Sequence, residues 1–344
     1  MKAASPRLRK SHRLAEIQVV YLAAHTGCDC RCLMCDIWKA DEGGVEMPPE
    51  TMEAQLTSLK ALKVRSVVLS GGEPLRHSNL WSFCRLLRDA GIRVVLGSNG
   101  TRLESSAPDV VQNCDQLVVS LDGNPAVHDR IRQVSGCAAR LAAGVKAVLE
   151  LAPDFPIIAR SVIQKHNCSE LHNIVRHGAQ LGLRAISFVA ADVSTTAFNR
   201  PERWNEPKIA QVALSHSDLC KLSRSIESLL TDFAWEFERR FIRTTPGQLW
   251  DIFRYYKALL GQCDFPQVRC RAPWVSAVME ADGAVRPCPF HPPYGTIDTT
   301  PLHELINRPA AVRFRRELRV TKNETCRSCV CATSRVAPEW ILDI

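Results

Sequence analysis

Six short apolar segments, separated by amphipathic stretches, follow one another between residues 19 and 189. Each segment is rich in Val and Ile and is too short to form a helix, which is the pattern of buried β-strands. Strands that alternate with helices pair in parallel and keep the helices outside the sheet. Six such units predict an α/β fold, a partial (β/α)6 barrel with parallel strands. The predicted strands are Val19–Ala24, Ser66–Leu69, Arg93–Leu96, Leu117–Leu121, Ile157–Ile163 and Ala185–Val189.

The stretches between these strands have the period of amphipathic helices, with apolar residues recurring every three or four positions. Ser78 is a predicted N-cap for the second helix, and Gly91 is its predicted stop. Other helices are predicted near residues 50–62, 141–148 and 169–182. Residues 200–261 have a helical pattern without a further strand, so the barrel is expected to stop at six units.

Length and composition favour a folded protein with one large domain and a smaller one. Of the 344 residues, 46% are hydrophobic and 23% are charged, which is enough apolar surface to form a core. No run of 18 apolar residues is present, so a membrane span is not expected. The basic N-terminus lacks the apolar core and cleavage pattern of a signal peptide, and we expect a cytoplasmic protein.

The same patterns predict the domain boundaries. Residues 1–14 form a basic tail, residues 15–235 the barrel, residues 236–261 a helical linker and residues 262–344 a small cysteine-rich domain. The formal net charge of +8 suits an anionic substrate or an acidic electron donor. Because the Lys and Arg residues are scattered and not interleaved with aromatic residues, a nucleic-acid partner is not expected.

The chain contains fifteen cysteines, a large number for a protein of a reducing compartment. Disulfides are disfavoured there, and the chain is far larger than the secreted mini-domains that disulfides hold together. Metal binding therefore explains the excess better. Five isolated cysteines are interpreted as small core residues, namely Cys84, Cys114, Cys137, Cys168 and Cys220.

Three cysteines lie directly after the first predicted strand in the spacing C-x3-C-x2-C. They are Cys28, Cys32 and Cys35. Thiolates are soft ligands that suit iron–sulfur clusters and zinc. A set of three leaves one coordination position for a ligand that is not protein, whereas a structural zinc ion takes four closed ligands. Cys30, inside the same loop, breaks the spacing and is not expected to be a ligand.

Glycines and small polar residues follow the next three predicted strands. The carboxyl ends of parallel strands lie at one edge of the sheet, where the active sites of such folds are found. Glycine lets the backbone approach a ligand closely, and a glutamate can accept a hydrogen bond from a cationic amine. The residues are Gly71, Gly72, Glu73 and Pro74 after the second strand, Ser98 and Asn99 after the third, and Ser120 and Asp122 after the fourth.

Together these motifs resemble the radical S-adenosylmethionine (SAM) superfamily. The cysteine triple, the Gly71–Pro74 segment and the Ser120–Gly123 segment match that superfamily in order, spacing and strand position, over about residues 15–230. The resemblance implies that Cys28, Cys32 and Cys35 hold a 4Fe–4S cluster. The fourth iron of that cluster would bind the amino and carboxylate groups of SAM.

The resemblance also implies which residues surround SAM. Glu73, with its neighbouring glycines, would hold the methionine amine, and Ser120 and Asp122 would lie near the ribose and carboxylate. Arg132 would pair with that carboxylate, whose geometry an arginine fork matches. Met34 stands where relatives often have an aromatic residue that packs on the adenine. The full predicted cofactor-binding set is Met34, Gly71, Gly72, Glu73, Pro74, Ser98, Asn99, Ser120, Asp122 and Arg132.

A second group of cysteines lies near the end of the chain. Cys270 and Cys288 belong to a C-x12-G-x4-C motif in which two short strands, Trp274–Met279 and Ala284–Arg286, predict a β-hairpin. Such a hairpin would bring the two thiols together, and a downstream C-x2-C-x-C motif supplies more. Four thiolates can close either a 4Fe–4S site or a zinc site.

This tail resembles the SPASM/Twitch extension that follows the core in many radical SAM enzymes. The shorter Twitch form, with one auxiliary 4Fe–4S cluster, fits the number of cysteines better than the full form. The implied ligands are Cys270, Cys288, Cys326 and Cys329. Cys331 can replace Cys329 or guard an open site.

The resemblance implies reductive cleavage of SAM to a 5′-deoxyadenosyl radical that abstracts hydrogen from a substrate. The net reaction would be dehydrogenation, epimerisation or bond formation, and a flavodoxin or ferredoxin would supply the electron. Asp192 and Arg200, which follow the sixth strand, are candidate catalytic residues.

Two alternatives stay open at this point. About seventeen residues precede the first strand, which favours a small-molecule substrate over a ribosomal peptide that a leader-recognition domain would bind. A zinc-braced binding protein without catalysis is the alternative outside the enzyme class; it would be colourless, whereas the enzyme would be brown.

Overall fold

One sheet of nine strands is the core of the structure, a computed structural model in which residues 12–40, 44–267, 270–298 and 300–331 are described. Its strand order is β6-β5-β4-β3-β2-β1-β7-β8-β9. The strands are β1 Val19–His25, β2 Ser66–Gly71, β3 Arg93–Ser98, β4 Gln116–Ser120, β5 Ile157–Ile163, β6 Ala185–Ala190, β7 Ser276–Glu280, β8 Ala284–Arg286 and β9 Gly295–Thr296.

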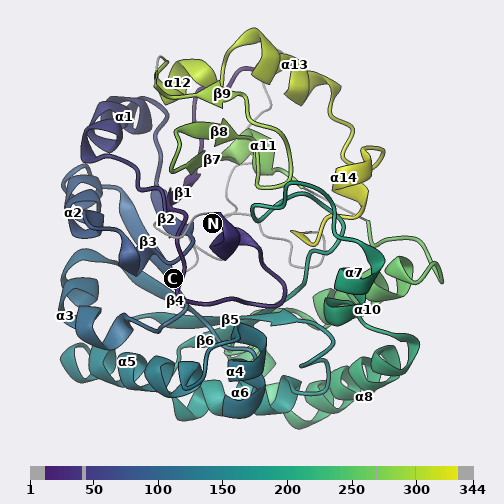
Figure 1. The fold of residues 1–344 in the computed structure, drawn as a ribbon. Coiled ribbons are helices and arrows are strands. Elements are labelled where there is room, and N and C mark those ends of the chain that lie inside the picture. Colours follow the sequence, from purple (N-terminus) through teal and green to yellow (C-terminus); the bar gives the residue numbers. More distant parts are fainter. Residues whose placement is uncertain (1–11, 41–43, 268–269, 299, 332–344) are drawn as a thin grey trace.

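The six predicted strands are confirmed, and they pair in parallel from β1 to β6. Their ends differ from the prediction by one or two residues. β2, for example, continues to Gly71, and β4 stops at Ser120 rather than Leu121. The predicted α/β partial barrel is therefore the observed fold. Its strands curve inside an arc of helices (Figure 1).

Five helices cover the outer face of the barrel (Figure 1). Apolar side chains of the helices meet outward-facing strand residues such as Leu22, Leu69 and Leu96, all of which are fully buried. Burial of a side chain of this size contributes about 1.5–3 kcal/mol, so this layer supplies most of the hydrophobic stabilisation. The helices are α1 Pro49–Ala61, α2 Leu80–Asp89, α3 Leu103–Asn113, α5 Cys137–Leu151 and α6 Leu171–Gln180.

The boundaries of α2 test two sequence signals. The predicted stop is confirmed, because Gly91 follows the helix with a φ of 73°, a left-handed conformation that glycine adopts without strain. The predicted N-cap is wrong: the cap residue is Asn79, and Ser78 instead donates its hydroxyl to the Glu46 carboxylate at 2.6 Å. Because the Ser78 hydroxyl bonds the Glu46 carboxylate on a neighbouring segment, it does not cap the helix.

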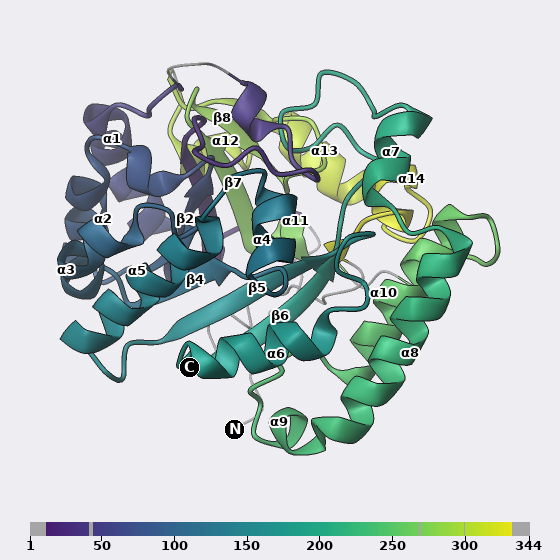
Figure 2. The same ribbon diagram turned by 60° about the horizontal axis from the view of Figure 1, so that its bottom comes forward.

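The region after the sixth strand is helical, as predicted, and forms a flank beside β6. In Figure 2, α8 and α10 run side by side along this edge. The hydroxyl of Tyr256, on α10, accepts a hydrogen bond from the Ala191 backbone at 2.9 Å, which fixes the end of β6. The elements after β6 are α7 Glu206–Val212, α8 His216–Asp232, α9 Ala234–Glu238 and α10 Pro246–Leu259. Earlier in the chain, α4 Pro125–Arg132 lies between β4 and β5.

The C-terminal hairpin continues the barrel sheet. β7 pairs in parallel with β1, with Val20 opposite Ala277, and β8 returns antiparallel to β7. The predicted hairpin is therefore present, and it shares a sheet with the barrel. The remaining short helices are η1 Ile37–Lys39, η2 Pro74–Arg76, α11 Ala272–Val275, α12 Leu302–Leu305, α13 Pro309–Glu317 and α14 Glu324–Arg327.

Contacts between distant segments hold the C-terminal part against the barrel. The Leu302 backbone donates to the Gln55 side chain of α1 at 2.8 Å, and Ser58 bonds His303 at 2.9 Å. In Figure 1, α12, α13 and α14 continue the ring that the outer helices begin. Across the described residues, no helix is both long enough and apolar enough to cross a membrane.

Candidate functional site

The loop after β1 carries the three predicted cluster ligands. Cys32 is buried, whereas Cys28 and Cys35 are half-buried, and all three contact one apolar cluster that includes Val127 and Ile131. The loop has little regular structure of its own. Its backbone is held by the end of α4, because the Arg31 and Leu33 amides donate to the Arg132 and Ile131 carbonyls at 3.1 and 3.0 Å.

The three thiols lie within electrostatic reach of one another. Burial raises the pKa of Cys35 to about 12, and negative charge on Cys32 and Cys28 adds to that shift. A hydrogen bond from Cys30 outweighs burial and lowers the pKa of Cys32 to about 7. Thiolates that repel one another in a buried loop are stabilised by bound iron, so the charge pattern fits a cluster.

Two polar side chains point at these sulfur atoms. Asn99 Nδ2 donates toward Sγ of Cys28 at 3.7 Å, and Arg132 Nη1 donates toward Sγ of Cys32 at 3.6 Å. Both donors favour the ionised form of the sulfur they face. Hydrogen bonds to cluster sulfurs also help to set reduction potential, so the residues present fit the group that the sequence predicts.

The Gly71–Gly72 segment lies against the start of the cysteine loop. The Gly72 amide donates to the His25 carbonyl at 2.7 Å, and the Glu73 amide donates to the Gly27 carbonyl at 2.9 Å. A Cβ added to Gly72 would lie 2.1 Å from the Gly27 carbonyl oxygen. The glycine is therefore required by close packing of two chain segments, a reason that the sequence pattern alone does not reveal.

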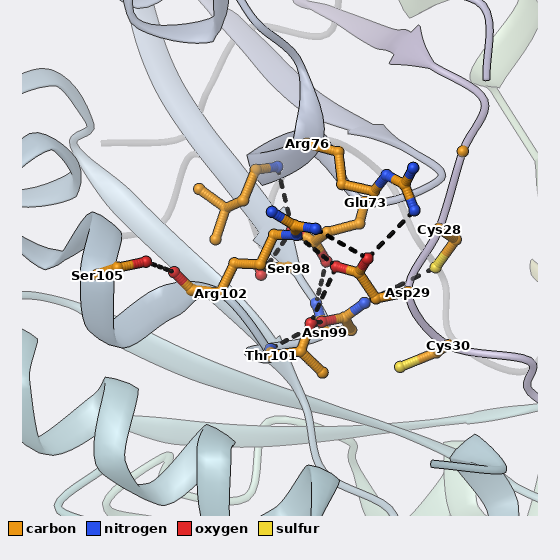
Figure 3. Close-up of polar contacts among 12 residues, drawn as sticks. Cys28, Asp29, Cys30, Glu73, Arg76, Ser98, Asn99, Thr101, Arg102 and Ser105 are labelled. Carbon is orange, nitrogen blue, oxygen red and sulfur yellow. Dashed lines mark hydrogen bonds and ion pairs between the residues drawn. The ribbon is translucent and has the colours of Figure 1, made fainter. Parts of the chain in front are cut away.

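Glu73 is a buried carboxylate at the centre of this rim (Figure 3). It accepts hydrogen bonds from the Asn99 backbone at 2.7 Å, from the Ser98 hydroxyl at 2.9 Å and from the Leu75 backbone at 3.1 Å. Burial raises its pKa to about 7 although these bonds oppose the shift. Each carboxylate oxygen has further lone pairs that a cationic amine can use.

An ion-pair network that the sequence analysis missed surrounds Asp29 (Figure 3). Its carboxylate pairs with Arg102 Nε at 2.6 Å and with Arg76 Nη1 at 3.2 Å, and it accepts a hydrogen bond from Thr101 at 3.3 Å. Burial raises the pKa of Asp29, but the hydrogen bonds from Arg102 and Thr101 and the positive charges of Arg102 and Arg76 together outweigh it and lower the pKa. The network ties the cysteine loop to η2 and to the loop after β3.

Asp122 and Arg132 form a buried ion pair. Arg132 Nη2 lies 2.6 Å from Asp122 Oδ2, and the other carboxylate oxygen accepts from the Val162 amide at 3.0 Å. Although burial opposes it, the Asp122 charge raises the pKa of Arg132, which stays protonated. Both residues were predicted to lie near the SAM carboxylate and ribose. That contact stays a prediction, and the pair's observed contacts hold β4, β5 and the cysteine loop together.

Asp192 and Arg200, the catalytic candidates, also pair with each other. Their side chains are fully buried, and Arg200 Nη1 donates to Asp192 Oδ2 at 2.7 Å. Arg200 Nη2 donates to the Met34 carbonyl at 3.2 Å, and the guanidinium stacks on Trp204 at 3.8 Å from the ring centre. This geometry links the segment after β6 to the cysteine loop. A catalytic role for either residue stays a prediction, and full burial does not favour it.

Four of the C-terminal cysteines line one small cavity. Cys270 and Cys288 flank the hairpin, and Cys326 and Cys329 come from α14 and the residues after it. Burial raises the pKa of Cys288 to about 12, with further contributions from negative charge on the neighbouring thiols. The turn between β7 and β8 contains Gly283 with a φ of 80°, which explains the glycine of the motif.

Cys331 does not line that cavity. Its electrostatic neighbours include Cys329, Arg160 and Asp192, so it lies toward the barrel strands. A hydrogen bond from Cys329 lowers the pKa of Cys331. The predicted cysteine-rich domain extends to residue 344, and its residues 332–344 lie outside the described part of the chain.

The remaining cysteines are either buried or exposed. Cys84, Cys114, Cys137 and Cys168 are buried as predicted, but Cys220 is exposed, so its core assignment is wrong. Cys30 is buried, and its Sγ lies 3.9 Å from Sγ of Cys137. Hydrogen bonding by Cys30, together with His128, lowers the pKa of Cys137 to about 5. Sequence spacing gives no signal for this pair, which is 107 residues apart.

No three His, Cys, Asp or Glu side chains within the described ranges converge closely enough to hold a single metal ion. In a 4Fe–4S cluster each thiolate binds a different iron, so the ligands stand farther apart than around one ion.

Comparison with protein families identifies two domains. Residues 24–176 match the radical SAM superfamily, and residues 270–330 match the SPASM iron–sulfur cluster-binding domain. The first range contains the three cysteines after β1 and the rim formed by β2, β3 and β4. The second range contains the four cysteines that line the C-terminal cavity.

The names of individual relatives refer to different products. AdoMet-dependent heme synthase of Methanosarcina barkeri is 32% identical over 165 residues, 45% of this chain and 45% of that protein. The chain thus spans less than half of that relative's length. The antilisterial bacteriocin subtilosin biosynthesis protein AlbA of Bacillus subtilis is 23% identical over 302 residues, 83% of this chain and 60% of AlbA.

A solved structure shows the same fold. Streptococcus suis SuiB, crystallised with the precursor peptide SuiA, superimposes with a TM-score of 0.67 and 18% sequence identity. The superposition covers 95% of this chain and 73% of SuiB.

Proposed function

Because this chain belongs to the radical SAM superfamily and contains a SPASM iron–sulfur cluster-binding domain, we propose that it catalyses reductive cleavage of SAM and hydrogen abstraction from a substrate. The observation that supports this most directly is the set of three thiols after β1, with Asn99 and Arg132 directed at two of their sulfurs. When bound, a reduced 4Fe–4S cluster supplies one electron to the sulfonium, which gives methionine and the 5′-deoxyadenosyl radical.

In this proposal Cys28, Cys32 and Cys35 are the cluster ligands, and Glu73 binds the methionine amine. The support for Glu73 is its position: Asn99 bonds the carboxylate through its backbone and faces Sγ of Cys28 through its side chain. An amine held by Glu73 would therefore lie close to the cluster ligands. The Ser98 hydroxyl donates to the other oxygen of the same carboxylate.

The four cysteines of the C-terminal cavity would hold a second 4Fe–4S cluster, in the Twitch manner. The support is that Cys270, Cys288, Cys326 and Cys329 all line the cavity, whereas Cys331 does not. A cluster at this place can take an electron from a substrate radical, which would make the net reaction an oxidation. A flavodoxin or ferredoxin would supply the electron for SAM cleavage, and the net charge of +8 suits an acidic donor.

The proposed substrate is a small molecule in a biosynthetic pathway. The support is the 32% identity over 165 residues with AdoMet-dependent heme synthase, whose name refers to a small-molecule product. A peptide substrate is the second candidate. It is favoured by the alignment with AlbA, which extends over 83% of this chain.

The experiment is anaerobic incubation of the reconstituted protein with SAM and dithionite, followed by quantification of 5′-deoxyadenosine. The proposal predicts its formation by the wild-type chain and none by C28A, C32A or C35A. Absence of 5′-deoxyadenosine from a wild-type chain loaded with iron would contradict the proposal. Zinc in place of iron, in a colourless protein, would support the alternative of a zinc-braced binding protein.

A further inference from the structure

A histidine lies among the cysteines of the C-terminal cavity. His291 lines the same space as Cys270, Cys288, Cys326 and Cys329. Its Nε2 is 3.3 Å from Sγ of Cys326, a hydrogen-bonding distance for nitrogen and sulfur. Nothing in the cysteine motif predicts it, because it stands three residues after Cys288 and 35 residues before Cys326.

The surroundings of His291 fix its ring in this position. The ring is buried and packs edge-on against Phe314 of α13, with 5.0 Å between ring centres. Its backbone amide donates to the Cys288 carbonyl at 3.4 Å, and its carbonyl accepts from Arg286 at 3.2 Å. The backbone is thus tied to one cluster cysteine while the side chain contacts another.

The hydrogen-bonding role of the ring follows from the atom that it presents to the Cys326 sulfur, which is Nε2. A neutral imidazole carries one N–H and one acceptor nitrogen. A thiolate bound to iron is an acceptor only, so the contact at Nε2 requires the tautomer with hydrogen on Nε2. In that form the imidazole donates a hydrogen bond and adds no formal charge to the site.

On these grounds, and resting on the proposed function of the cavity as a cluster site, we propose that His291 donates a hydrogen bond to the Cys326 sulfur of the auxiliary cluster and raises its reduction potential. The hydrogen bond withdraws negative charge from the sulfur. It therefore stabilises the reduced cluster, which carries one more negative charge, over the oxidised one. His291 is a positioning and tuning residue rather than a ligand.

The contact also argues against direct ligation by His291. In a cubane each iron takes one protein ligand, and Cys326 would occupy the iron nearest to its own sulfur. The four cysteines already complete the ligand set that such a cluster takes.

The test uses the full-length chain with C28A, C32A and C35A, so that the auxiliary cluster is the only one present. H291L removes the donor at similar volume, and H291Q restores an amide N–H at a comparable position. The matched control is H303L, since His303 contacts Ser58 and lies outside the cavity. Each protein is prepared anaerobically, and its iron content and redox midpoint are measured, the latter by titration monitored with EPR.

The expected result is about four irons in every variant, a more negative midpoint for H291L, partial or full return in H291Q and no change in H303L. An unchanged midpoint in H291L with the cluster intact would overturn this inference and leave the cluster assignment standing. Loss of iron from H291L alone would also overturn it, because His291 would then be a ligand. No iron in the parent chain, with the barrel cysteines absent, would refute the auxiliary cluster and the inference together.

If the triple replacement prevents folding, the same variants are made with all cysteines present. SAM addition then identifies the barrel cluster, because only its spectrum should change. The midpoint of the SAM-insensitive signal is compared between wild type, H291L and H291Q, with the same expected order.

Discussion

The backbone N–H of Asn99 donates a hydrogen bond to Oε2 of Glu73 at 2.7 Å. The side-chain amide of the same asparagine lies 3.7 Å from Sγ of Cys28. One residue at the end of β3 therefore connects the predicted amine-binding carboxylate with a predicted cluster ligand. The polar residues that follow β3 therefore have a structural role, because they join the cysteine loop to the segment after β2.

SAM affinity should depend on pH through Glu73. Because burial raises its pKa to about 7, the carboxyl group is ionised above that pH and can attract the cationic amine. As pH falls below about 7, protonation should weaken SAM binding, by up to tenfold for each further unit. Anaerobic calorimetry between about pH 8 and about pH 6 measures this. E73Q should bind weakly throughout, and a flat wild-type profile would contradict the role of Glu73.

The same shift has a consequence for the protein without SAM. The folded-state pKa of Glu73 is above its unfolded value of 4.5, so the folded state binds more protons between these values. This contribution to stability is fully present below the unfolded pKa and is lost as pH rises through about 7. E73Q should remove this pH-dependent decrease in the free energy of unfolding. Denaturant unfolding of the apoprotein at a series of pH values measures it.

Removing Arg132 should destabilise the fold. R132M would leave the buried Asp122 carboxylate without its partner, at a cost of about 3–5 kcal/mol in the free energy of unfolding. Adding D122N should recover part of that loss, because the uncompensated charge disappears. The control is R130M, which alters an exposed arginine of the same helix. Urea unfolding of the anaerobic apoproteins checks the order, and equal stability of R132M and R130M would refute it.

Arg200 should not tolerate lysine. R200K keeps the charge, but it loses the forked hydrogen bonds to Asp192 and the Met34 carbonyl and the stacking on Trp204. We expect a loss of about 1–3 kcal/mol in stability and less iron bound at the cysteine loop. R203K is the comparison, since within the described ranges the contact of the Arg203 side chain is an exposed ion pair with Glu324. Similar iron contents in both variants would count against a role for Arg200 in holding the loop.

Iron content should distinguish the C-terminal cysteines that bind the auxiliary cluster from Cys331, which does not. Alanine at any of the four that line the cavity should lower iron from about eight to about four per chain. C331A should retain about eight, because Cys331 does not line the cavity. Iron loss in C331A, with retention in C329A, would mean that Cys331 is the fourth ligand.

The strands and the cysteine groups were predictable from the sequence, because both depend on short local patterns. Val and Ile runs indicate buried strands, and thiol spacing indicates candidate ligand sets, whose binding of iron stays a prediction. The helix α3 was not predicted individually. Its sequence, with Ser105, Ser106 and an internal Pro108, has few helix-forming signals, and packing against α5 stabilises it.

Pairings between distant segments were not predictable. The parallel pairing of β7 with β1 joins residues 257 positions apart, and no periodicity in either segment encodes the partner. The ion pairs of Asp122 with Arg132 and of Asp192 with Arg200 were likewise not predicted, although all four residues were named as candidate site residues, a role that stays a prediction. Charged residues at strand ends indicate a site, whereas their partners are decided by the packed fold.

The central claim is that Cys28, Cys32 and Cys35 hold a cluster that binds SAM. The most direct measurement is EPR of the reduced, anaerobically purified chain with and without SAM, together with iron content. The wild type and C30S, a change in the same loop, should contain about eight irons and show a signal that SAM alters. C28A, C32A and C35A should retain about four irons and show no SAM-dependent change. A SAM-sensitive signal in any of these three variants, or a wild-type protein that binds no iron, would contradict the claim.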